Sequence, residues 1–477
     1  WHGGPLDTID TPGEQGSQSF GNSLGARFDL PRKEQDPSQA LAVASYQNKT
    51  DSQVVEEHLD ELISLADSCG ISVLETRSWI LKTPSASTYI NVGKLEEIEE
   101  ILKEFPSIGT LIIDEEITPS QQRNLEKRLG LVVLDRTELI LEIFSSRALT
   151  AEANIQVQLA QARYLLPRLK RLWGHLSRQK SGGGSGGFVK GEGEKQIELD
   201  RRMVRERIHK LSAQLKAVIK QRAERRKVKS RRGIPTFALI GYTNSGKSTL
   251  LNLLTAADTY VEDKLFATLD PKTRKCVLPG GRHVLLTDTV GFIRKLPHTL
   301  VAAFKSTLEA AFHEDVLLHV VDASHPLALE HVQTTYDLFQ ELKIEKPRII
   351  TVLNKVDRLP QGSIPMKLRL LSPLPVLISA KTGEGIQNLL SLMTEIIQEK
   401  SLHVTLNFPY TEYGKFTELC DAGVVASSRY QEDFLVVEAY LPKELQKKFR
   451  PFISYVFPED CGDDEGRGPV LESSFGD

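Results

Sequence analysis

The sequence has few cysteines and no long hydrophobic run. Its four cysteines, Cys69, Cys276, Cys420 and Cys461, lie far apart and form no C-x-x-C pair. This spacing argues against a disulfide framework or a zinc site and fits a reducing compartment. No apolar run approaches the roughly 18 residues that a membrane helix needs, and the N-terminus lacks the apolar core of a signal peptide. We therefore expect no membrane partner.

The length of 477 residues is too great for one ordinary core and predicts about three domains. Hydrophobic residues make up 40% and charged residues 26%, as in soluble globular proteins. The chain begins at Trp1 rather than Met. A processed targeting segment and a shorter piece of a longer chain would both give this start, and the sequence does not decide between them.

The net charge of −3 conceals a strong asymmetry. Between Arg163 and Arg232 there are 22 lysines and arginines and only 6 acidic residues, so this segment carries +16 and the rest of the chain −19. A solvated helix face is the usual explanation of a charge run. Here the excess is too one-sided to be offset by ion pairs within the helices, and it favours binding to a nucleic acid.

The N-terminal third divides into a disordered segment and a small domain. Residues 1–39 are rich in Gly, Pro, Ser, Asp and Gln, so we expect them to be disordered. Residues 40–150 alternate apolar runs with helical patterns, which predicts a small parallel α/β domain without a phosphate loop. The predicted strands are 40–45, 71–74, 110–113 and 131–134, and the predicted helices are 54–65, 94–104, 119–129 and 137–145.

Residues 151–232 predict an antiparallel helical hairpin with a flexible tip. Two helical patterns, 151–179 and 194–231, flank the glycine cluster 181–187, and Pro167 is expected to kink the first helix. Glycine lets the backbone approach RNA closely, so we predict RNA contacts at the tip and along the basic face. An interdomain spacer is the alternative. The predicted RNA-binding residues are Lys180, Gly183, Gly186, Lys190, Lys195, Arg201, Arg202 and Arg205.

Residues 233–401 contain a phosphate-binding loop, Gly241-Tyr-Thr-Asn-Ser-Gly246-Lys247-Ser248-Thr249, directly after the apolar run 237–240. In this pattern backbone N–H groups surround the β-phosphate, the lysine reaches the β- and γ-phosphates, and the serine hydroxyl binds Mg²⁺. A chance Gly/Ser-rich turn is the alternative, and the apolar helix that follows argues against it. The predicted nucleotide-binding residues of this loop are Gly241, Asn244, Ser245, Gly246, Lys247, Ser248 and Thr249.

Three later motifs, each following a predicted strand, indicate guanine as the base. The first is D-x-x-G, in which Asp288 is a predicted Mg²⁺ ligand and the Gly291 N–H senses the γ-phosphate. The others are Asn354-Lys355-Val-Asp357 and Ser379-Ala380-Lys381. A buried Asp357 carboxylate would accept two hydrogen bonds that guanine offers and adenine does not, and the Ala380 N–H would donate to guanine O6.

These motifs, together with Phe266-Ala-Thr268-Leu-Asp-Pro271 and the segment 193–202 after the glycine cluster, resemble the HflX family of translation-type GTPases over residues 40–457. Members usually carry Arg-Gly-Pro-Gly-Glu-Thr-Gln at the tip, where this chain has Val189-Lys-Gly-Glu-Gly-Glu-Lys-Gln196. The resemblance implies binding to the large ribosomal subunit and its rRNA, with the hairpin tip near the peptidyl-transferase centre, and GTP-dependent ribosome splitting or recycling or late subunit assembly.

The resemblance also implies switch residues. Thr268 would bind Mg²⁺ and the γ-phosphate in the GTP state only. The predicted catalytic residues are thus Lys247, Thr268, Asp288 and Gly291, and the predicted Mg²⁺ ligands are Ser248, Thr268 and Asp288. Phe292 stands where many GTPases place a water-orienting glutamine, so we expect slow hydrolysis that the ribosome stimulates. Asn244 is either a K⁺ ligand or a loop-forming residue.

The C-terminal patterns predict a small α+β domain over residues 402–458, with histidines as surface groups, and a disordered tail over 459–477. We expect a monomer in the mitochondrial matrix, with the cytoplasm as the alternative. Two other functions stay open. One is an RNA-binding module in which GTP only fixes domain orientation, and the other is a GTPase acting on tRNA or another structured RNA.

Overall fold

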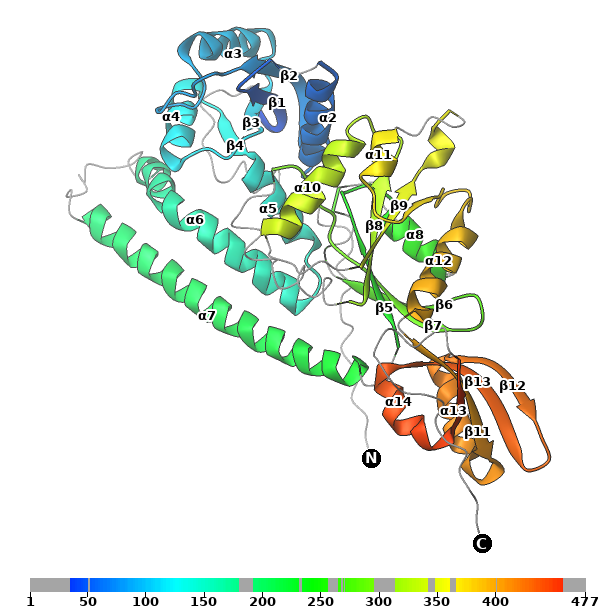
Figure 1. Ribbon diagram of the computed structural model, residues 1–477. Helices are drawn as coiled ribbons and strands as arrows, with labels where there is room; N and C mark the ends of the chain where they lie inside the picture. The colour runs from blue at the N-terminus through cyan, green and yellow to red at the C-terminus, as the bar shows by residue number, and fades with distance from the viewer. Residues whose placement is uncertain are drawn as a thin grey trace, which may run out of the picture.

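The computed structural model describes residues 35–49, 52–179, 192–230, 234–255, 265–266, 269, 271–295, 314–341, 348–360, 366–399 and 401–457. Residues 1–34 and 458–477, the hairpin tip and Thr268 lie outside these ranges, whereas residues 36–39 of the segment predicted to be disordered belong to the first strand. Within them the predicted multidomain α/β fold is confirmed (Figure 1): a parallel α/β domain, two long helices, a second parallel α/β domain and a small antiparallel-sheet domain follow one another along the chain.

The N-terminal domain is a parallel sheet with helices on both faces. Its strands lie in the order β2-β1-β3-β4, and all pairs are parallel. α2 and α5 pack on one face and α3 and α4 on the other. The elements are β1 (Asp36–Tyr46), α2 (Ser52–Ser68), β2 (Ser72–Ile80), α3 (Val92–Glu104), β3 (Ile108–Ile113), α4 (Pro119–Leu129), β4 (Val132–Asp135) and α5 (Arg136–Arg147).

Local chemistry explains several of these boundaries. α4 begins at a capping box, in which Thr118 and Gln121 bond each other's backbone N–H, and it ends at Gly130 in the left-handed region. Asp135 caps α5 by accepting from the Glu138 N–H. β1 begins at Asp36, four residues before the predicted start of order, because that end of the strand pairs with Ile108 of β3.

Two long helices, α6 (Ala151–Gln179) and α7 (Glu192–Ser230), form the hairpin, with α7 outermost in Figure 1. Their seam is built on Leu159, Leu211 and Leu215, at positions that the helical periodicity predicts. Leu165, although it lies at the same helical spacing as Leu159, is exposed instead. α6 remains one continuous helix across Pro167.

The nucleotide-binding domain is a six-stranded sheet in the order β10-β9-β8-β5-β7-β6, with only β6 antiparallel. β5 lies centrally, so the loop after it opens at the carboxyl edge of the sheet, where such sheets bind ligands. The elements are β5 (Thr236–Ile240), α8 (Lys247–Thr255), β6 (Lys272–Val277), β7 (His283–Asp288), β8 (Val316–Asp322), α10 (Ala328–Glu341), β9 (Arg348–Asn354), a 3₁₀ turn (Val356–Arg358), α11 (Met366–Leu370), β10 (Pro375–Leu377) and α12 (Ile386–Gln398).

The C-terminal domain has the split β-α-β, ferredoxin-like order of elements. Its antiparallel sheet runs β12-β13-β11-β14, and both α13 and α14 pack on one face of it. The elements are β11 (Ser401–Pro409), α13 (Tyr413–Ala422), β12 (Val425–Tyr430), β13 (Phe434–Pro442), α14 (Lys443–Phe449) and β14 (Ile453–Val456). No helix within the described ranges is both long and apolar enough to cross a bilayer.

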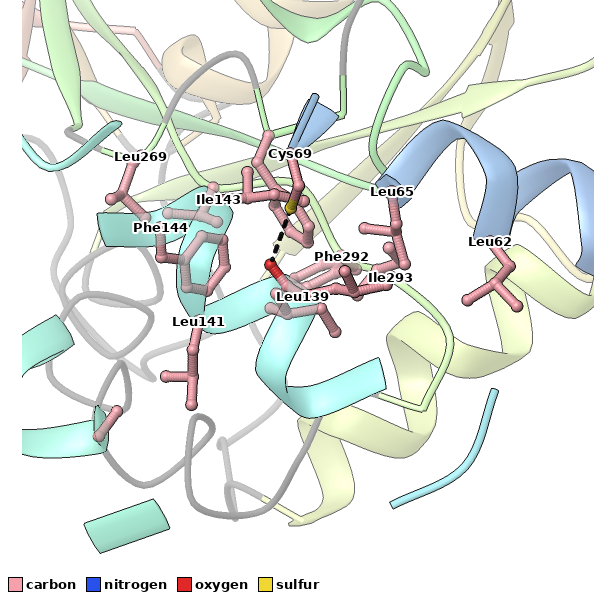
Figure 2. Packing of buried hydrophobic residues seen from close by; sticks show 14 of the residues in the cluster. Leu62, Leu65, Cys69, Leu139, Leu141, Ile143, Phe144, Leu269, Phe292 and Ile293 are labelled. Atoms are coloured by element: carbon pink, nitrogen blue, oxygen red, sulfur yellow. Dashed lines mark hydrogen bonds between the residues drawn. The ribbon is translucent and has the colours of Figure 1, made fainter. Parts of the chain in front are cut away.

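One hydrophobic core joins the N-terminal domain, the hairpin and the nucleotide-binding domain. It combines Leu62 and Leu139 of the N-terminal domain with Val157 of α6 and with Phe292 and Ile293 after β7. Figure 2 shows Phe292 and Ile293 beside Leu65 and Leu139. The segment that follows the D-x-x-G motif is therefore packed against the N-terminal domain rather than exposed.

Candidate active site

The loop after β5 has the backbone conformation of a phosphate-binding loop. Gly241 and Gly246 have φ angles of +142° and +93°. A Cβ on Gly241 would lie 2.1 Å from the Val320 carbonyl oxygen, and a Cβ on Gly246 would lie 2.3 Å from Asn354 Nδ2. Only glycine fits both positions. Asn244 also has a positive φ, +57°, which asparagine tolerates better than most residues. Its backbone conformation therefore accounts for an asparagine here without a K⁺ ion.

Lys247, predicted to bind phosphate, is buried at the start of α8. Its Nζ donates to the carbonyl oxygens of Gly241 and Tyr242, at 3.1 and 2.7 Å. Burial lowers the pKa of Lys247 to about 8, and the Asp288 carboxylate opposes this shift. A buried ammonium with few negative neighbours is suited to bind a phosphate, because the anion would compensate its lost hydration.

Ser248 and Asp288 form the predicted metal pair. Ser248 Oγ donates to Asp288 Oδ2 at 2.7 Å, so a serine hydroxyl and a carboxylate meet at the loop, a donor set of hard oxygens that Mg²⁺ prefers. Two further hydroxyls, Thr243 Oγ1 and Ser245 Oγ, are buried without a hydrogen-bond partner among the described residues. Thr249 is half-buried beside them. The residues present thus fit a magnesium–phosphate group.

The D-x-x-G segment lies directly against the loop. Thr243 N–H donates to the Phe292 carbonyl at 2.7 Å, and Phe292 N–H donates to the Gly241 carbonyl at 3.0 Å. A Cβ on Gly291 would lie 2.8 Å from Thr243 Cα and 3.0 Å from Lys247 Nζ, and the backbone contact requires glycine for this approach. The Phe292 side chain points into the shared core and is 3% exposed. A side chain anchored in this way cannot orient an attacking water.

Asn354 joins the base-binding motifs to the loop. Its Nδ2 donates to the Ser245 carbonyl, and its Oδ1 accepts from the Ala380 N–H, both at 2.9 Å. The sequence motif predicts that this N–H donates to guanine O6. In the structure it is bonded to Asn354, because the two motifs close on each other, and its bond to the base stays a prediction.

Asp357 differs from its prediction in burial. The carboxylate is exposed rather than buried, because it lies on a 3₁₀ turn beyond the end of β9. Ser379 Oγ donates to Asp357 Oδ1 at 2.7 Å and is the main reason why its pKa is lowered. Lys381 is exposed nearby, and Lys355 Nζ is paired with Asp322 at 2.7 Å. The base end of the site is therefore open, and a bound base would itself bury Asp357.

Comparison with known proteins decides the family. Three family models match: "GTP-binding GTPase N-terminal" over residues 56–145, "GTP-binding GTPase Middle Region" over 147–229 and "50S ribosome-binding GTPase" over 236–355. GTPase HflX of Lacrimispora saccharolytica is 44% identical over 414 residues, which are 87% of this chain and 95% of that protein. GTPase HflX of Escherichia coli is 40% identical over 75% of this chain and 83% of that protein. The chain belongs to the HflX family.

It is accordingly a GTP-binding protein and a GTPase, as the motifs predict. Among solved structures, a GTP-binding protein from Sulfolobus solfataricus in complex with GDP matches with 27% identity and a TM-score of 0.41, covering 76% of this chain and 99% of that one.

A buried ionic cluster joins the N-terminal domain of this HflX-family GTPase to the segment after D-x-x-G. Asp114, directly after β3, pairs with Arg136 Nη1 at 2.7 Å, with Arg294 Nη2 at 2.6 Å and with Lys295 Nζ at 3.0 Å. Glu61 of α2 binds Arg136 as well. Burial alone would raise the pKa of Asp114, but the three cations lower it to about 2.

Tyr242 connects this cluster to the phosphate-binding loop. Its hydroxyl accepts from the Arg294 N–H at 2.6 Å and donates to Glu61. Its ring stacks on His331 of α10, with centroids 3.7 Å apart. Sequence reasoning missed this group entirely, since Glu61, Asp114 and Arg294 are far apart in the chain. The only local signal is a charged Arg294-Lys295 pair three residues after Gly291.

A second buried group fixes α6 to the N-terminal domain. Arg168 Nη2 donates to Asp135 at 3.0 Å and to the Ile117 carbonyl at 2.7 Å, and its guanidinium lies 3.6 Å from the Tyr164 ring centroid. The Tyr164 hydroxyl donates to Asp135 at 3.0 Å. The base of the hairpin and the N-terminal domain are therefore held together by buried polar contacts as well as by the shared core.

The predicted RNA-binding residues fall in two groups. Arg201, Arg202 and Arg205 lie on α7, and Arg202 and Arg205 are exposed, whereas Arg201 is half-buried. Lys195 lies on the same helix, and its side chain is outside the described ones. Lys180, Gly183, Gly186 and Lys190 lie outside the described residues. RNA binding by this set stays a prediction.

Proposed function

We propose that this GTPase uses GTP binding and hydrolysis to time its association with the large ribosomal subunit, in ribosome splitting and recycling or in late subunit assembly. One observation carries the proposal: a buried route leads from the phosphate-binding loop to the hairpin. It runs from Tyr242 and Arg294 through Asp114 and the N-terminal sheet to Asp135, and from there to Arg168 of α6.

The route supports a switch because its two ends lie at sites for different ligands, the nucleotide at one end and RNA at the other. The phosphate end lies against Gly291, whose position depends on the segment that the N-terminal domain holds. The far end is α6, which packs along α7, and the exposed Arg202 and Arg205 of α7 suit a polyanion such as rRNA. A shift of the segment after Gly291 between nucleotide states would therefore bias the direction of the hairpin.

In the proposed mechanism Lys247 binds the β- and γ-phosphates, while Ser248 and Asp288 would hold Mg²⁺, which supplies charge neutralisation during phosphoryl transfer. Thr268 would join them in the GTP state. Phe292 is fixed in the core, so the chain offers no water-orienting side chain at that position. Hydrolysis is therefore slow until the ribosome supplies or positions the missing group. Asp357 and Ser379 select guanine.

Titration of GTPase activity with purified large subunits, with free tRNA and with buffer alone tests the proposal. We expect strong stimulation by large subunits and little by tRNA. Activation by tRNA but not by subunits would instead support a GTPase that acts on tRNA or another structured RNA.

The Lys247→Ala variant tests the second candidate, a ribosome-binding module in which GTP only fixes domain orientation. A GTP-driven switch should lose subunit splitting in this variant, because the phosphates lose their lysine. A module would keep most of its splitting activity. Ser87→Ala, on an exposed loop of the N-terminal domain, is the control and should leave splitting unchanged.

Three finer proposals have their own measurements. Equal hydrolysis rates in K⁺ and Na⁺ buffers would rule out a K⁺ role for Asn244. Light scattering coupled to gel filtration distinguishes the proposed monomer from a dimer. Protease protection in isolated mitochondria tests the proposed matrix location against a cytoplasmic one.

A further inference from the structure

Among the described residues of the C-terminal domain, both helices lie on one face of the sheet and none lies on the other. Val404, Leu406, Leu435 and Val437 point toward α13 and α14 and form the domain core with Phe449. Because side chains alternate along a strand, the residues between them point to the opposite face. The pairing register places these outward residues in rows across the four strands, and the GTPase domain adjoins them at one end, where Arg282 Nη2 donates to Ser401 Oγ.

The first row consists of three stacked aromatic rings. His403 of β11 lies between Tyr440 of β13 and Phe457, with ring centroids 4.3 and 3.8 Å away and planes tilted by 14° and 12°. His403 Nε2 lies 2.8 Å from Glu438, which fixes the ring. The sequence analysis expected the histidines of this domain to be surface groups. His403 is instead partly buried, because two flat rings enclose it.

Tyr455 of β14 extends the aromatic surface into the next row. It pairs with Thr405, and its ring stands at 87° to that of Phe457, with centroids 5.2 Å apart. An edge-to-face contact of this kind leaves at least one face of Tyr455 uncovered by Phe457, and the residue is 52% exposed. An exposed, braced ring on a sheet surface is a platform on which another flat ring can stack.

Polar side chains share this open face. Those of β11 lie beside Tyr455, and those of β12 lie at the opposite edge of the sheet, with β13 and β11 between them and β14. Thr405 and Asn407 of β11 are half-buried, and Ser427 and Arg429 of β12 are exposed. Arg429 is opposite Val436 and so belongs to the same face. Residues 401–457 contain 6 lysines and arginines and 7 acidic residues, so the domain has no basic excess. Recognition here must depend on stacking and hydrogen bonds more than on phosphate charge.

We propose that this open face, centred on Tyr455, binds unpaired RNA bases by stacking. Four-stranded sheets with helices on one face and aromatic side chains on the other bind single-stranded RNA in this way, and stacking contributes about 1–3 kcal/mol per base. The choice of RNA rests on the proposed function, since rRNA is the polymer that the protein would meet. A protein segment is the competing occupant.

The test compares two tyrosines of the same domain in the full chain. Tyr455→Ala removes the platform, and Tyr430→Ala removes a tyrosine that is 65% exposed and is paired with the inward-pointing Leu435. Binding of a fluorescent single-stranded oligouridylate is measured by anisotropy at about 0.3 M salt, which weakens the contacts of the basic hairpin. We expect Tyr455→Ala to weaken binding about tenfold and Tyr430→Ala less than about twofold.

Two further variants sharpen the result. Tyr455→Phe keeps the ring and should restore binding. Arg202→Ala in the hairpin should reduce the slope of log K against log salt by about 0.7, whereas Tyr455→Ala should leave the slope unchanged. Ultraviolet crosslinking should place oligouridylate on the peptide that contains Tyr455. Equal affinity of Tyr455→Ala and Tyr430→Ala, or crosslinks on the hairpin alone, would overturn the proposal.

Large-subunit binding separates this proposal from the proposed function. If Tyr455→Ala weakens binding to subunits but not to oligouridylate, the face binds a ribosomal protein and the RNA proposal is wrong. If the wild-type chain binds oligouridylate through Tyr455 but fails to bind large subunits, the proposed function is wrong and the RNA face stands.

Discussion

Asp114 and Asp135 occupy equivalent places and behave in opposite ways. They stand at the carboxyl ends of neighbouring parallel strands, β3 and β4, and both side chains are at most 1% exposed. Asp114 faces the GTPase domain and has a pKa of about 2. Asp135 faces the hairpin, and burial together with the neighbouring Glu138 raises its pKa to about 7 despite Arg168.

The difference shows that burial does not set the charge of a carboxylate by itself. Asp114 has three cationic partners, and two of them, Arg294 and Lys295, come from the GTPase domain. Asp135 has one cation and an acidic neighbour. The contact that depends on the nucleotide-binding domain is thus strongly ionic, whereas the contact that holds the hairpin is a nearly neutral hydrogen-bond group. Separating the contact with the nucleotide-binding domain therefore has a larger electrostatic cost than separating the contact with the hairpin.

Asp114→Asn should give the largest effect. The amide keeps the shape of the carboxylate but leaves Arg136, 2% exposed, and Arg294 with Glu61 as the anion that they still share. Breaking one side of a buried ion pair costs about 3–5 kcal/mol. We expect this loss in the first transition of urea unfolding monitored by circular dichroism.

Glu115→Gln is the matched control for that change. Glu115 also pairs with Lys295, but it is partly exposed, so its loss should cost less than about 1 kcal/mol. Similar losses for the two variants would mean that the Asp114 cluster is no more than a surface ion pair.

Tyr242→Phe, which changes a residue of the Asp114 cluster, should have a smaller effect than Asp114→Asn. It removes the hydroxyl that accepts from the Arg294 N–H and donates to Glu61, while the ring still stacks on His331. A buried donor left unsatisfied costs about 1–3 kcal/mol. The free energy of the same unfolding transition measures this cost. Tyr410→Phe, which changes an exposed tyrosine of the C-terminal domain, should leave that free energy unchanged.

The succession of strands and helices along the chain and the nucleotide motifs follow from sequence because each depends on neighbouring residues. Alternating apolar and helical patterns predict the parallel N-terminal sheet, and the loop from Gly241 to Ser248 is a local motif. Helix caps such as Thr118 with Gln121 are likewise local. Features of this kind are fixed within about ten residues, so pattern reasoning reaches them.

Features set by distant partners escape that reasoning. Asp114 and Arg294 are separated by 180 residues, and nothing near either one indicates the other. The same reason explains why Asp357 is exposed rather than buried and why the Ala380 N–H is bonded to Asn354. Both depend on how β9 and the loop after β10 close on Asn354, which no single motif encodes.

The pH dependence of stability should differ in sign between the two aspartates. The folded pKa of Asp114 is lowered, so its contribution is complete above about pH 4 and is lost as the pH falls toward 2. The folded pKa of Asp135 is raised, so its contribution is complete below about pH 4 and is lost as the pH rises toward 7. The Asp135→Asn change should abolish the second dependence only.

The measurement is the difference in unfolding free energy between wild type and Asp135→Asn at several pH values. From about pH 4 to 7 this difference should fall by at most about 1.4 kcal/mol per pH unit, the value for one proton. A difference that stays flat would show that Asp135 is ionised like Asp114, and the contrast between the two sites would disappear.

Tyr164→Phe is the finest probe of the hairpin side. The Tyr164 hydroxyl donates to Asp135 at 3.0 Å, and its ring supports the Arg168 guanidinium. Phenylalanine keeps the ring, so only the contacts of the hydroxyl with Asp135 and, at 3.3 Å, with Glu138 are lost, and a lost hydrogen bond costs about 0.5–1.5 kcal/mol. Loss of this donor should also raise the pKa of Asp135 further, because the hydroxyl stabilises the ionised form. The pH at which Asp135 loses its contribution should therefore move upward relative to wild type, and a downward shift would contradict the hydrogen-bond assignment.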